Sequence, residues 1–343
     1  MLYLLLLLPP LLIIAAVIVH LARLPASFAI QRSRLMRVDR PRLFDAVRDL
    51  RSWKAWSPWL LHEPGAELSY SDEPDHESGS YRWDGKHIGA GTLTQVRFQA
   101  PDRIDQRIVF RRPFKAQSDV WWEFKEQDGG TEVTWGMRGR MPFGLRFMVP
   151  TMSRAIAKDY DLGLAMLNGY LDPSAAHPEI RFVGPCERAP RRAVTIPFSG
   201  SMEAMVAAME EGFPRLAAQL EGLGITPAGE PFTVYHKVDA KAGLFVCDLA
   251  MPIPDGADSG ELLVKEFDGG RYFLTELRGS YDFLESAWHS LTAHLRMYRI
   301  KQDRTRPSLE VYAEDPRSVG HENEILTQIF VPIHPKPRPE RHA

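Results

Sequence analysis

One acidic side chain on an alternating strand, Glu310, is the residue of this sequence best placed to do chemistry. Residues 308–312 read Ser-Leu-Glu-Val-Tyr, so Leu309 and Val311 point to one face of a strand, and Glu310 and Tyr312 to the other. We expect the apolar pair to meet packed helices, which leaves Glu310 facing a groove. A partly buried carboxylate among aromatic rings attracts a flat, hydrophobic cation through charge and cation–π contact.

Aromatic residues would supply the other contacts to a small molecule. The expected ligand-binding set is Tyr281 and Trp288 as walls, with Tyr235, Tyr272 and Tyr312 beside them. The residues alone favour a plainer alternative, in which Glu310 lies on an edge strand and faces water.

No motif of a catalytic centre accompanies these residues. The sequence contains no HExxH, GxSxG, P-loop or GxGxxG pattern. His289 and His294 are five residues apart, so they do not share a helical face as metal ligands would, and Cys186 and Cys247 form no CxxC pair. The sequence therefore predicts no catalytic residue, no metal and no cofactor, and it favours a binding protein over an enzyme.

Length and composition indicate the number of domains and exclude one class of partner. A chain of 343 residues, 44% hydrophobic and 25% charged, should fold as more than one domain. The formal net charge of −2 gives no electrostatic footprint for nucleic acid, so no nucleic-acid partner is expected. Nothing in the sequence identifies a protein partner.

The first residues predict a membrane anchor. Leu2 to Ala22 carries no charged side chain and is long enough for a helix that crosses a bilayer. The run is longer than the apolar part of a typical signal peptide, and no Lys or Arg precedes it. We expect residues 1–24 to be a transmembrane anchor in the inner or cytoplasmic membrane. The arginines that follow then place the body of a single-pass protein in the cytoplasm.

Residues 31–172 predict the first folded domain. A strand over 31–38 leads to a short helix that Asp39 caps and Pro41 begins, and about six antiparallel strands follow. The apolar spacing over 152–171 predicts one long helix. Laid across a curved sheet, that helix closes its apolar face and leaves a cavity.

This order resembles the helix-grip fold of the START-like (SRPBCC) superfamily, which includes polyketide cyclases. Residues 53–59 (WKAWSPW), 79–83 (GSYRW) and 89–92 (GAGT) carry the resemblance, which implies an apolar ligand. Trp56 and Trp83 are therefore candidate ligand-binding residues. The burial habit of large aromatic side chains favours a place in the core instead.

An internal repeat makes up most of the second domain, residues 191–335. It follows a proline-rich linker over 173–190, in which residues 180–183 are a candidate short strand. Each half reads strand, helix, strand, strand, with Tyr235 and Tyr312 in equivalent places. Side by side, the halves would form one sheet with two helices on one face. Residues 336–343 are expected to be a disordered tail.

The repeat resembles the GyrI-like (gyrase-inhibitor-like) effector-binding domain, which also occurs in AraC-type regulators. Residues 279–288 (GSYDFLESAW), 309–312 (LEVY) and 330–333 (FVPI) carry the resemblance. It implies a pocket with a glutamate at the position of Glu310, which outweighs the solvent-facing alternative. No helix-turn-helix accompanies the domain, so control of transcription is not implied.

We thus expect an α+β protein with a transmembrane helix, a helix-grip antiparallel sheet domain and a duplicated strand-helix-strand-strand domain. The leading hypothesis is a membrane-anchored sensor, sequestering agent or carrier of hydrophobic, cationic small molecules. One alternative is a hydrolase or cyclase for an apolar electrophile, with Glu310 as general base and Tyr281 or Tyr312 as acid. The other is a protein-interaction module of the gyrase-inhibitor type.

Overall fold

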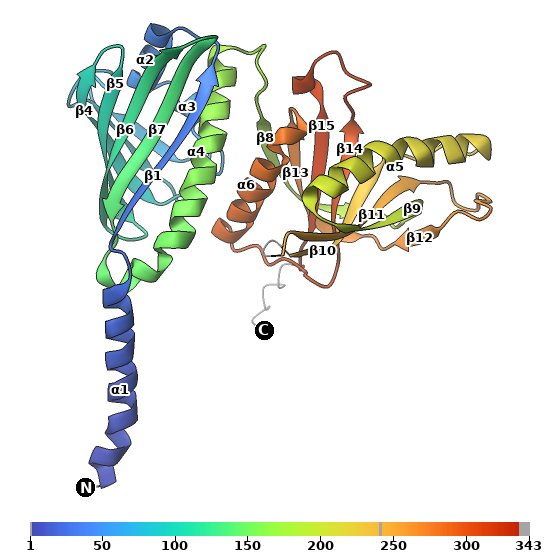
Figure 1. Ribbon diagram of the computed structural model, residues 1–343, viewed down its shortest axis with the longest axis horizontal. Coiled ribbons are helices and arrows are strands. Elements are labelled where there is room, and N and C mark those ends of the chain that lie inside the picture. Colours follow the sequence, from blue (N-terminus) through green and yellow to red (C-terminus); the bar gives the residue numbers. More distant parts are fainter. Residues whose placement is uncertain (1, 240–241, 336–343) are drawn as a thin grey trace, which may run out of the picture. The chain divides into compact units, whose positions relative to one another are not determined.

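Two antiparallel sheets with helices make this an α+β protein (Figure 1). The computed structural model describes residues 2–239 and 242–335. The chain divides into two compact units, residues 1–176 and 177–343. The predicted disordered tail, residues 336–343, lies outside the described residues.

The predicted transmembrane helix is wrong. Residues Leu2–Arg23 form helix α1, but no helix within the described residues combines the length and the apolarity that a membrane span needs. The location of the body in the cell stays a prediction.

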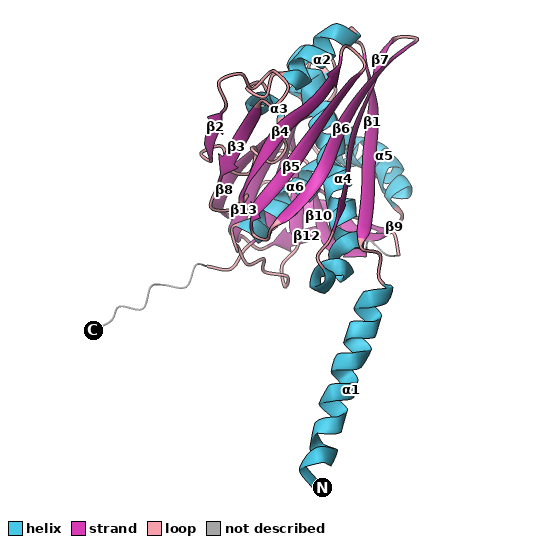
Figure 2. Ribbon diagram, turned by 90° about the vertical axis from the view of Figure 1, so that its left-hand side faces the viewer, coloured by secondary structure: helices cyan, strands magenta, loops and turns pink. Residues whose placement is uncertain are grey.

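The first unit is a seven-stranded antiparallel sheet with one long helix along it (Figure 2). The strand order is β1-β7-β6-β5-β4-β3-β2. The strands are β1 (Ser27–Met36), β2 (Glu67–Tyr70), β3 (Ser80–Asp84), β4 (Ala90–Gln99), β5 (Arg103–Arg112), β6 (Ala116–Gln127) and β7 (Gly130–Arg140). The helices after α1 are α2 (Arg40–Arg48), α3 (Trp53–Trp56), the 3-10 helix η1 (Phe143–Met148) and α4 (Val149–Leu171).

Local chemistry explains where α2 begins. The side chain of Asp39 accepts a hydrogen bond from the backbone N–H of Arg42 at 3.2 Å, and Pro41 occupies the first turn. An N-cap carboxylate satisfies an N–H that has no partner inside the helix, and proline is tolerated at that place. The predicted start of this helix is confirmed.

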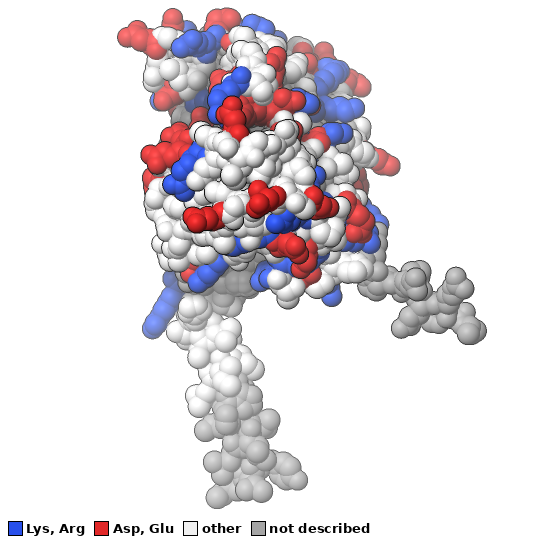
Figure 3. Space-filling view, turned by 90° about the vertical axis from the view of Figure 1, so that its right-hand side faces the viewer, with Lys and Arg blue, Asp and Glu red and all other residues white. Residues whose placement is uncertain are grey.

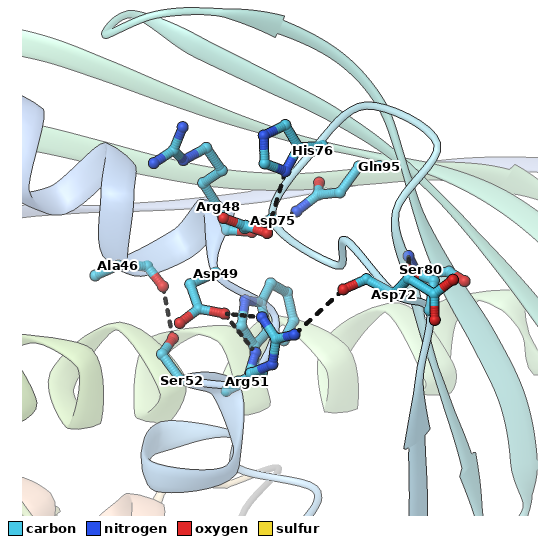
Figure 4. A network of polar contacts seen from close by, with 12 residues as sticks. Ala46, Arg48, Asp49, Arg51, Ser52, Asp72, Asp75, His76, Ser80 and Gln95 are labelled. Carbon is cyan, nitrogen blue, oxygen red and sulfur yellow. Dashed lines mark hydrogen bonds and ion pairs between the residues drawn. The ribbon is translucent and has the colours of Figure 1, made fainter.

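Polar contacts fasten the loops around α2 and α3 to the sheet (Figure 4). The amide of Gln95, on β4, donates to the carbonyl of Arg48 at 2.8 Å, at the end of α2. The Ser52 hydroxyl donates to the carbonyl of Ala46 at 2.6 Å. These bonds satisfy backbone groups that the helix ends leave without partners.

Stacked aromatic rings occupy the centre of the first unit. Trp122 and Trp135 stack with ring centroids 4.3 Å apart, and Trp135 stacks on Tyr160 of α4 at 4.0 Å. Gly163 lets α4 approach this stack, because a Cβ there would lie 2.7 Å from Trp135 and 3.1 Å from Pro58. The α4–sheet contact therefore depends on the absence of a side chain at residue 163.

Replacing Gly163 with alanine tests this packing. Alanine normally stabilises a helix relative to glycine, but here the added methyl group must displace an indole ring. We expect Gly163→Ala to lower the free energy of unfolding by about 1–3 kcal/mol in urea titrations. Gly144→Ala is the matched control, since a Cβ there meets nothing within 4 Å. Equal stability of the two variants would contradict this account of the core.

The second unit is an eight-stranded antiparallel sheet of order β12-β9-β11-β10-β14-β15-β13-β8. Its strands are β8 (Glu179–Arg188), β9 (Arg191–Gly200), β10 (Phe232–Asp239), β11 (Leu244–Pro252), β12 (Val264–Phe267), β13 (Gly270–Arg278), β14 (Ser308–Glu314) and β15 (Leu326–Pro332). Its helices are α5 (Met202–Gly222), α6 (Leu284–Met297) and the 3-10 helices η2 (Tyr281–Phe283) and η3 (Glu322–Glu324).

The two repeats meet at the middle of this sheet. One consists of β9, α5, β10 and β11, the other of β13, α6, β14 and β15, and β10 pairs with β14 so that Thr233 lies opposite Glu310. The stretch predicted as a linker, 173–190, contains β8, which pairs with β13 along its length. The sheet therefore begins within the stretch predicted as a linker, and the candidate strand at residues 180–183 is part of the longer β8.

Candidate functional site

Glu310 lies at the centre of the second unit, in the strand that joins the two repeats. Its side chain is buried, with 2% of the residue exposed. Tyr235 and Tyr312 donate hydrogen bonds to Oε2 at 2.8 and 3.0 Å, and the indole N–H of Trp288 donates to Oε1. Both carboxylate oxygens therefore have partners, and all three donors are neutral aromatic side chains.

Thr233 extends this network to the first repeat. It is fully buried, and its hydroxyl lies 3.0 Å from that of Tyr312. Because the Tyr312 proton points to the carboxylate when Glu310 is ionised, Thr233 then donates to the Tyr312 oxygen. Glu310 is thus supported by side chains from both halves of the sheet.

Among the described residues, no basic side chain forms an ion pair with Glu310, so its charge has no cationic partner there. Burial raises the pKa of the Glu310 carboxyl, and the three hydrogen bonds oppose that shift. Burial and the nearby carboxylate raise the pKa of Tyr235 and of Tyr312. The tyrosines therefore keep their protons and remain donors.

Further aromatic rings pack around these donors. Tyr281 of η2 packs edge-on against Tyr312, with ring centroids 5.7 Å apart, and Phe213 of α5 does so at 5.4 Å. Tyr235 and Trp288 are likewise edge-on, at 6.1 Å. Burial raises the pKa of Tyr281 to about 12, and the charges of Asp315 and Glu310 act in the same direction. The carboxylate therefore lies inside an aromatic enclosure.

Models of known protein families match both units. Residues 28–172 match polyketide cyclase / dehydrase and lipid transport proteins, and residues 183–334 match the GyrI-like small molecule binding domain. The chain is a polyketide-cyclase-type domain followed by a GyrI-like domain. The suspected architecture is confirmed, and both domains are of small-molecule-binding types.

Solved structures are similar to parts of the chain at low identity and low TM-score. The C-terminal domain of EcmrR is 16% identical, covering 46% of this chain and 98% of that one, with a TM-score of 0.38. SAV2435 bound to tetraphenylphosphonium is 12% identical over 46% and 94%, with a TM-score of 0.35. CalU16 from Micromonospora echinospora is 16% identical over 43% and 76%, with a TM-score of 0.30. The search of curated proteins found no match.

The GyrI-like domain brings together four of the predicted aromatic residues, but on the face opposite to the one expected. Leu309 and Val311 pack into an apolar cluster that contains no helical residue, whereas Glu310 faces α5 and α6. The prediction that the apolar pair meets the helices is wrong, because the other face of the sheet is apolar too. Tyr235, Tyr281, Trp288 and Tyr312 surround Glu310.

Tyr272 is not part of this site. It belongs to the apolar cluster on the other face of the sheet, where its ring packs edge-on against Phe330 at 6.3 Å. The sequence could not place it, because the face that a residue of β13 presents depends on its register with β15 and β8.

Trp56 and Trp83 lie in the other domain, in the core of the polyketide-cyclase-type unit. Trp56 is fully buried, packs against Trp122 and Trp135, and donates to the Ser52 hydroxyl at 3.1 Å. Trp83 is buried against Phe110. Their role in ligand binding stays a prediction.

Two residues of the Glu310 environment were absent from the predicted set. Thr233 was detectable as the counterpart of Glu310 in the first repeat. Phe213 carries no such signal, because only the packing of α5 brings it to Tyr312.

The chemistry available at Glu310 is attraction of positive charge. Within the described residues, no group of three or more His, Cys, Asp or Glu side chains is placed to hold a metal ion. Acidic and basic side chains are intermixed on the surface shown in Figure 3, so that face carries no single-sign patch of the kind that binds nucleic acid.

The pH dependence of stability tests the burial of Glu310. Folding raises the pKa of this carboxyl above its unfolded value of about 4.3. Its contribution to stability is therefore full below that value and is lost as pH rises through the folded pKa. We expect Glu310→Gln, measured by urea titration, to gain stability relative to wild type as pH rises.

The exposed Glu314 on the same strand provides the control. Glu314→Gln should follow the wild-type dependence on pH. If Glu310→Gln also follows it, the carboxyl is not in the environment described here.

Proposed function

We propose that the GyrI-like domain binds a hydrophobic aromatic cation at Glu310, and that the protein acts as a sensor, sequestering agent or carrier for such molecules. One observation supports the proposal. The buried Glu310 carboxylate accepts hydrogen bonds from three neutral donors, and it pairs with no cation in the described chain.

The energetics favour a cation over other ligands. Removing a carboxylate from water costs several kcal/mol, and neutral hydrogen bonds return only part of that cost. A cationic ligand supplies the missing Coulomb attraction where water does not screen it. The rings of Tyr281, Tyr235 and Trp288 add dispersion and cation–π contacts.

A ligand reaches the carboxylate by replacing one of its donors. Trp288 on α6 and Tyr235 on β10 are the donors open to exchange, because both residues are only partly buried whereas Tyr312 is buried. A displaced indole ring remains available as a wall against the bound molecule. A ligand with a delocalised charge fits this exchange, since it needs no hydrogen bonds in place of those it breaks.

Calorimetric titration with tetraphenylphosphonium tests the proposal. Wild type should bind it saturably, and Glu310→Gln should bind at least about tenfold more weakly, because one buried charge interaction is worth more than about 1.4 kcal/mol. Glu314→Gln, on the exposed end of the same strand, should bind like wild type. Neutral triphenylphosphine oxide should bind weakly to all three. Absence of saturable binding by wild type, or equal binding by Glu310→Gln, would refute the proposal.

The same titration should depend on pH in a defined direction. Only the ionised carboxylate attracts the cation, and burial raises the pKa of Glu310. The affinity for tetraphenylphosphonium should therefore fall as pH decreases through that raised pKa, over a range above that of an exposed glutamate. The Glu310→Gln variant should show no such fall. A pH-independent wild-type affinity would mean that ionisation of Glu310 plays no part in binding.

A further inference from the structure

The face of the GyrI-like sheet that carries no α-helix holds a second group of aromatic and charged residues. We name as the helix-free face the cluster of Phe232, Tyr272, Leu309, Val311 and Phe330, with the partly exposed Cys186, Phe267 and Leu274 at its margin. None of these side chains belongs to the Glu310 site, which lies on the opposite face.

Arg188, at the end of edge strand β8, lies on this face in an unusual state. Its guanidinium carbon is 3.9 Å from the ring centroid of Phe330. Within residues 2–239 and 242–335, no oxygen accepts a hydrogen bond from this guanidinium and no carboxylate pairs with it. Burial, and then repulsion by Arg191, lowers the pKa of Arg188. The Arg188 charge therefore makes a cation–π contact with Phe330 but has no anionic partner among the described residues.

A second arginine on this face, Arg306, differs from Arg188 because its guanidinium donates hydrogen bonds within the chain. Arg306 lies 4.9 Å from the ring centroid of Tyr272 and donates to the carboxylate of Asp303 and to the carbonyls of Gly269 and Arg271. The donors of Arg306 are therefore committed to the chain, whereas those of Arg188 are available.

Tyr272 adds a second polar group near Arg188. Its hydroxyl makes no hydrogen bond to another described residue, and burial raises the pKa of Tyr272, so the hydroxyl keeps its proton although the charges of Arg306 and Arg188 oppose the shift. Tyr272 lies opposite Cys186 in the β8–β13 pairing, two residues along the strand from Arg188. A guanidinium and a hydroxyl without acceptors therefore lie close together among phenyl rings.

We infer that the helix-free face binds an aromatic carboxylate. The planar guanidinium of Arg188 presents parallel N–H donors that match the two oxygens of a carboxylate, and Tyr272 donates a further hydrogen bond. The partly exposed Phe267 and Leu274 at the margin of this face offer apolar contact to the rest of the ligand. This site has the opposite charge preference to Glu310 and does not depend on the function proposed for that residue.

Titration of the full chain with 2-naphthoate tests the inference. Wild type should bind saturably, and Arg188→Gln should bind at least about tenfold more weakly, the loss expected for a charge-assisted hydrogen bond. Arg181→Gln is the matched control, because Arg181 lies on the same strand and is exposed and paired with Glu276. It should bind like wild type. Tyr272→Phe keeps the ring and should show an intermediate loss.

Two further ligands test the carboxylate contact and the aromatic contact separately. Neutral 2-naphthamide should bind much more weakly than 2-naphthoate, and inorganic phosphate should also bind more weakly because it contacts no ring. Circular dichroism should show that Arg188→Gln is folded, and Glu310→Gln should retain 2-naphthoate binding. Equal affinity of wild type and Arg188→Gln, or no saturable binding by wild type, would overturn the inference.

Discussion

The GyrI-like domain depends on one constraint, which is a carboxylate removed from water at the junction of two repeats. Burial disfavours the ionised form of Glu310, and the hydrogen bonds that Tyr235, Tyr312 and Trp288 donate oppose this effect. These donors come from β10, β14 and α6, so the pairing of the two central strands and the position of one helix must both be correct. The site is therefore a product of the whole domain rather than of one loop.

The alternation of side chains along a strand gives this sheet two different surfaces. On β14, Glu310 and Tyr312 face the helices, and Leu309 and Val311 face the apolar cluster beside Arg188. Neighbouring residues of β14 therefore lie in different environments, one around the Glu310 carboxylate and the other in the apolar cluster. A shift of one residue in the β10–β14 register would exchange them, which would place a carboxylate in the apolar cluster.

Local chemistry was predictable from the sequence, and so were the family resemblances. The Asp39 cap and Pro41 fix the start of α2 through contacts within a few residues, and the two-residue period places Glu310 and Tyr312 on a common face. That face was assigned wrongly, because apolar residues on both sides of the sheet gave no preference. The contact of Trp288 with Glu310 spans 22 residues, so only packing of α6 fixes it.

Patterns that lacked tertiary information failed in identifiable ways. Apolarity alone suggested a membrane span at the N-terminus, although the described helices include none that qualifies. The proline-rich stretch 173–190 was predicted as a linker, but β8 lies within it, and an edge strand tolerates a residue such as Pro185 because one side of it needs no hydrogen-bond donors. Tyr272 was grouped with Glu310 because strand register is invisible in a single sequence.

The pairing of Thr233 with Glu310 has a consequence for how such a duplicated domain can change over time. The two positions are directly opposite across the repeat junction. If both held glutamate, two carboxylates would share one enclosed space, and mutual repulsion would force one of them to bind a proton. A hydroxyl in one half and an acid in the other avoid this conflict. The halves can therefore keep a common backbone, but their central residues cannot stay identical.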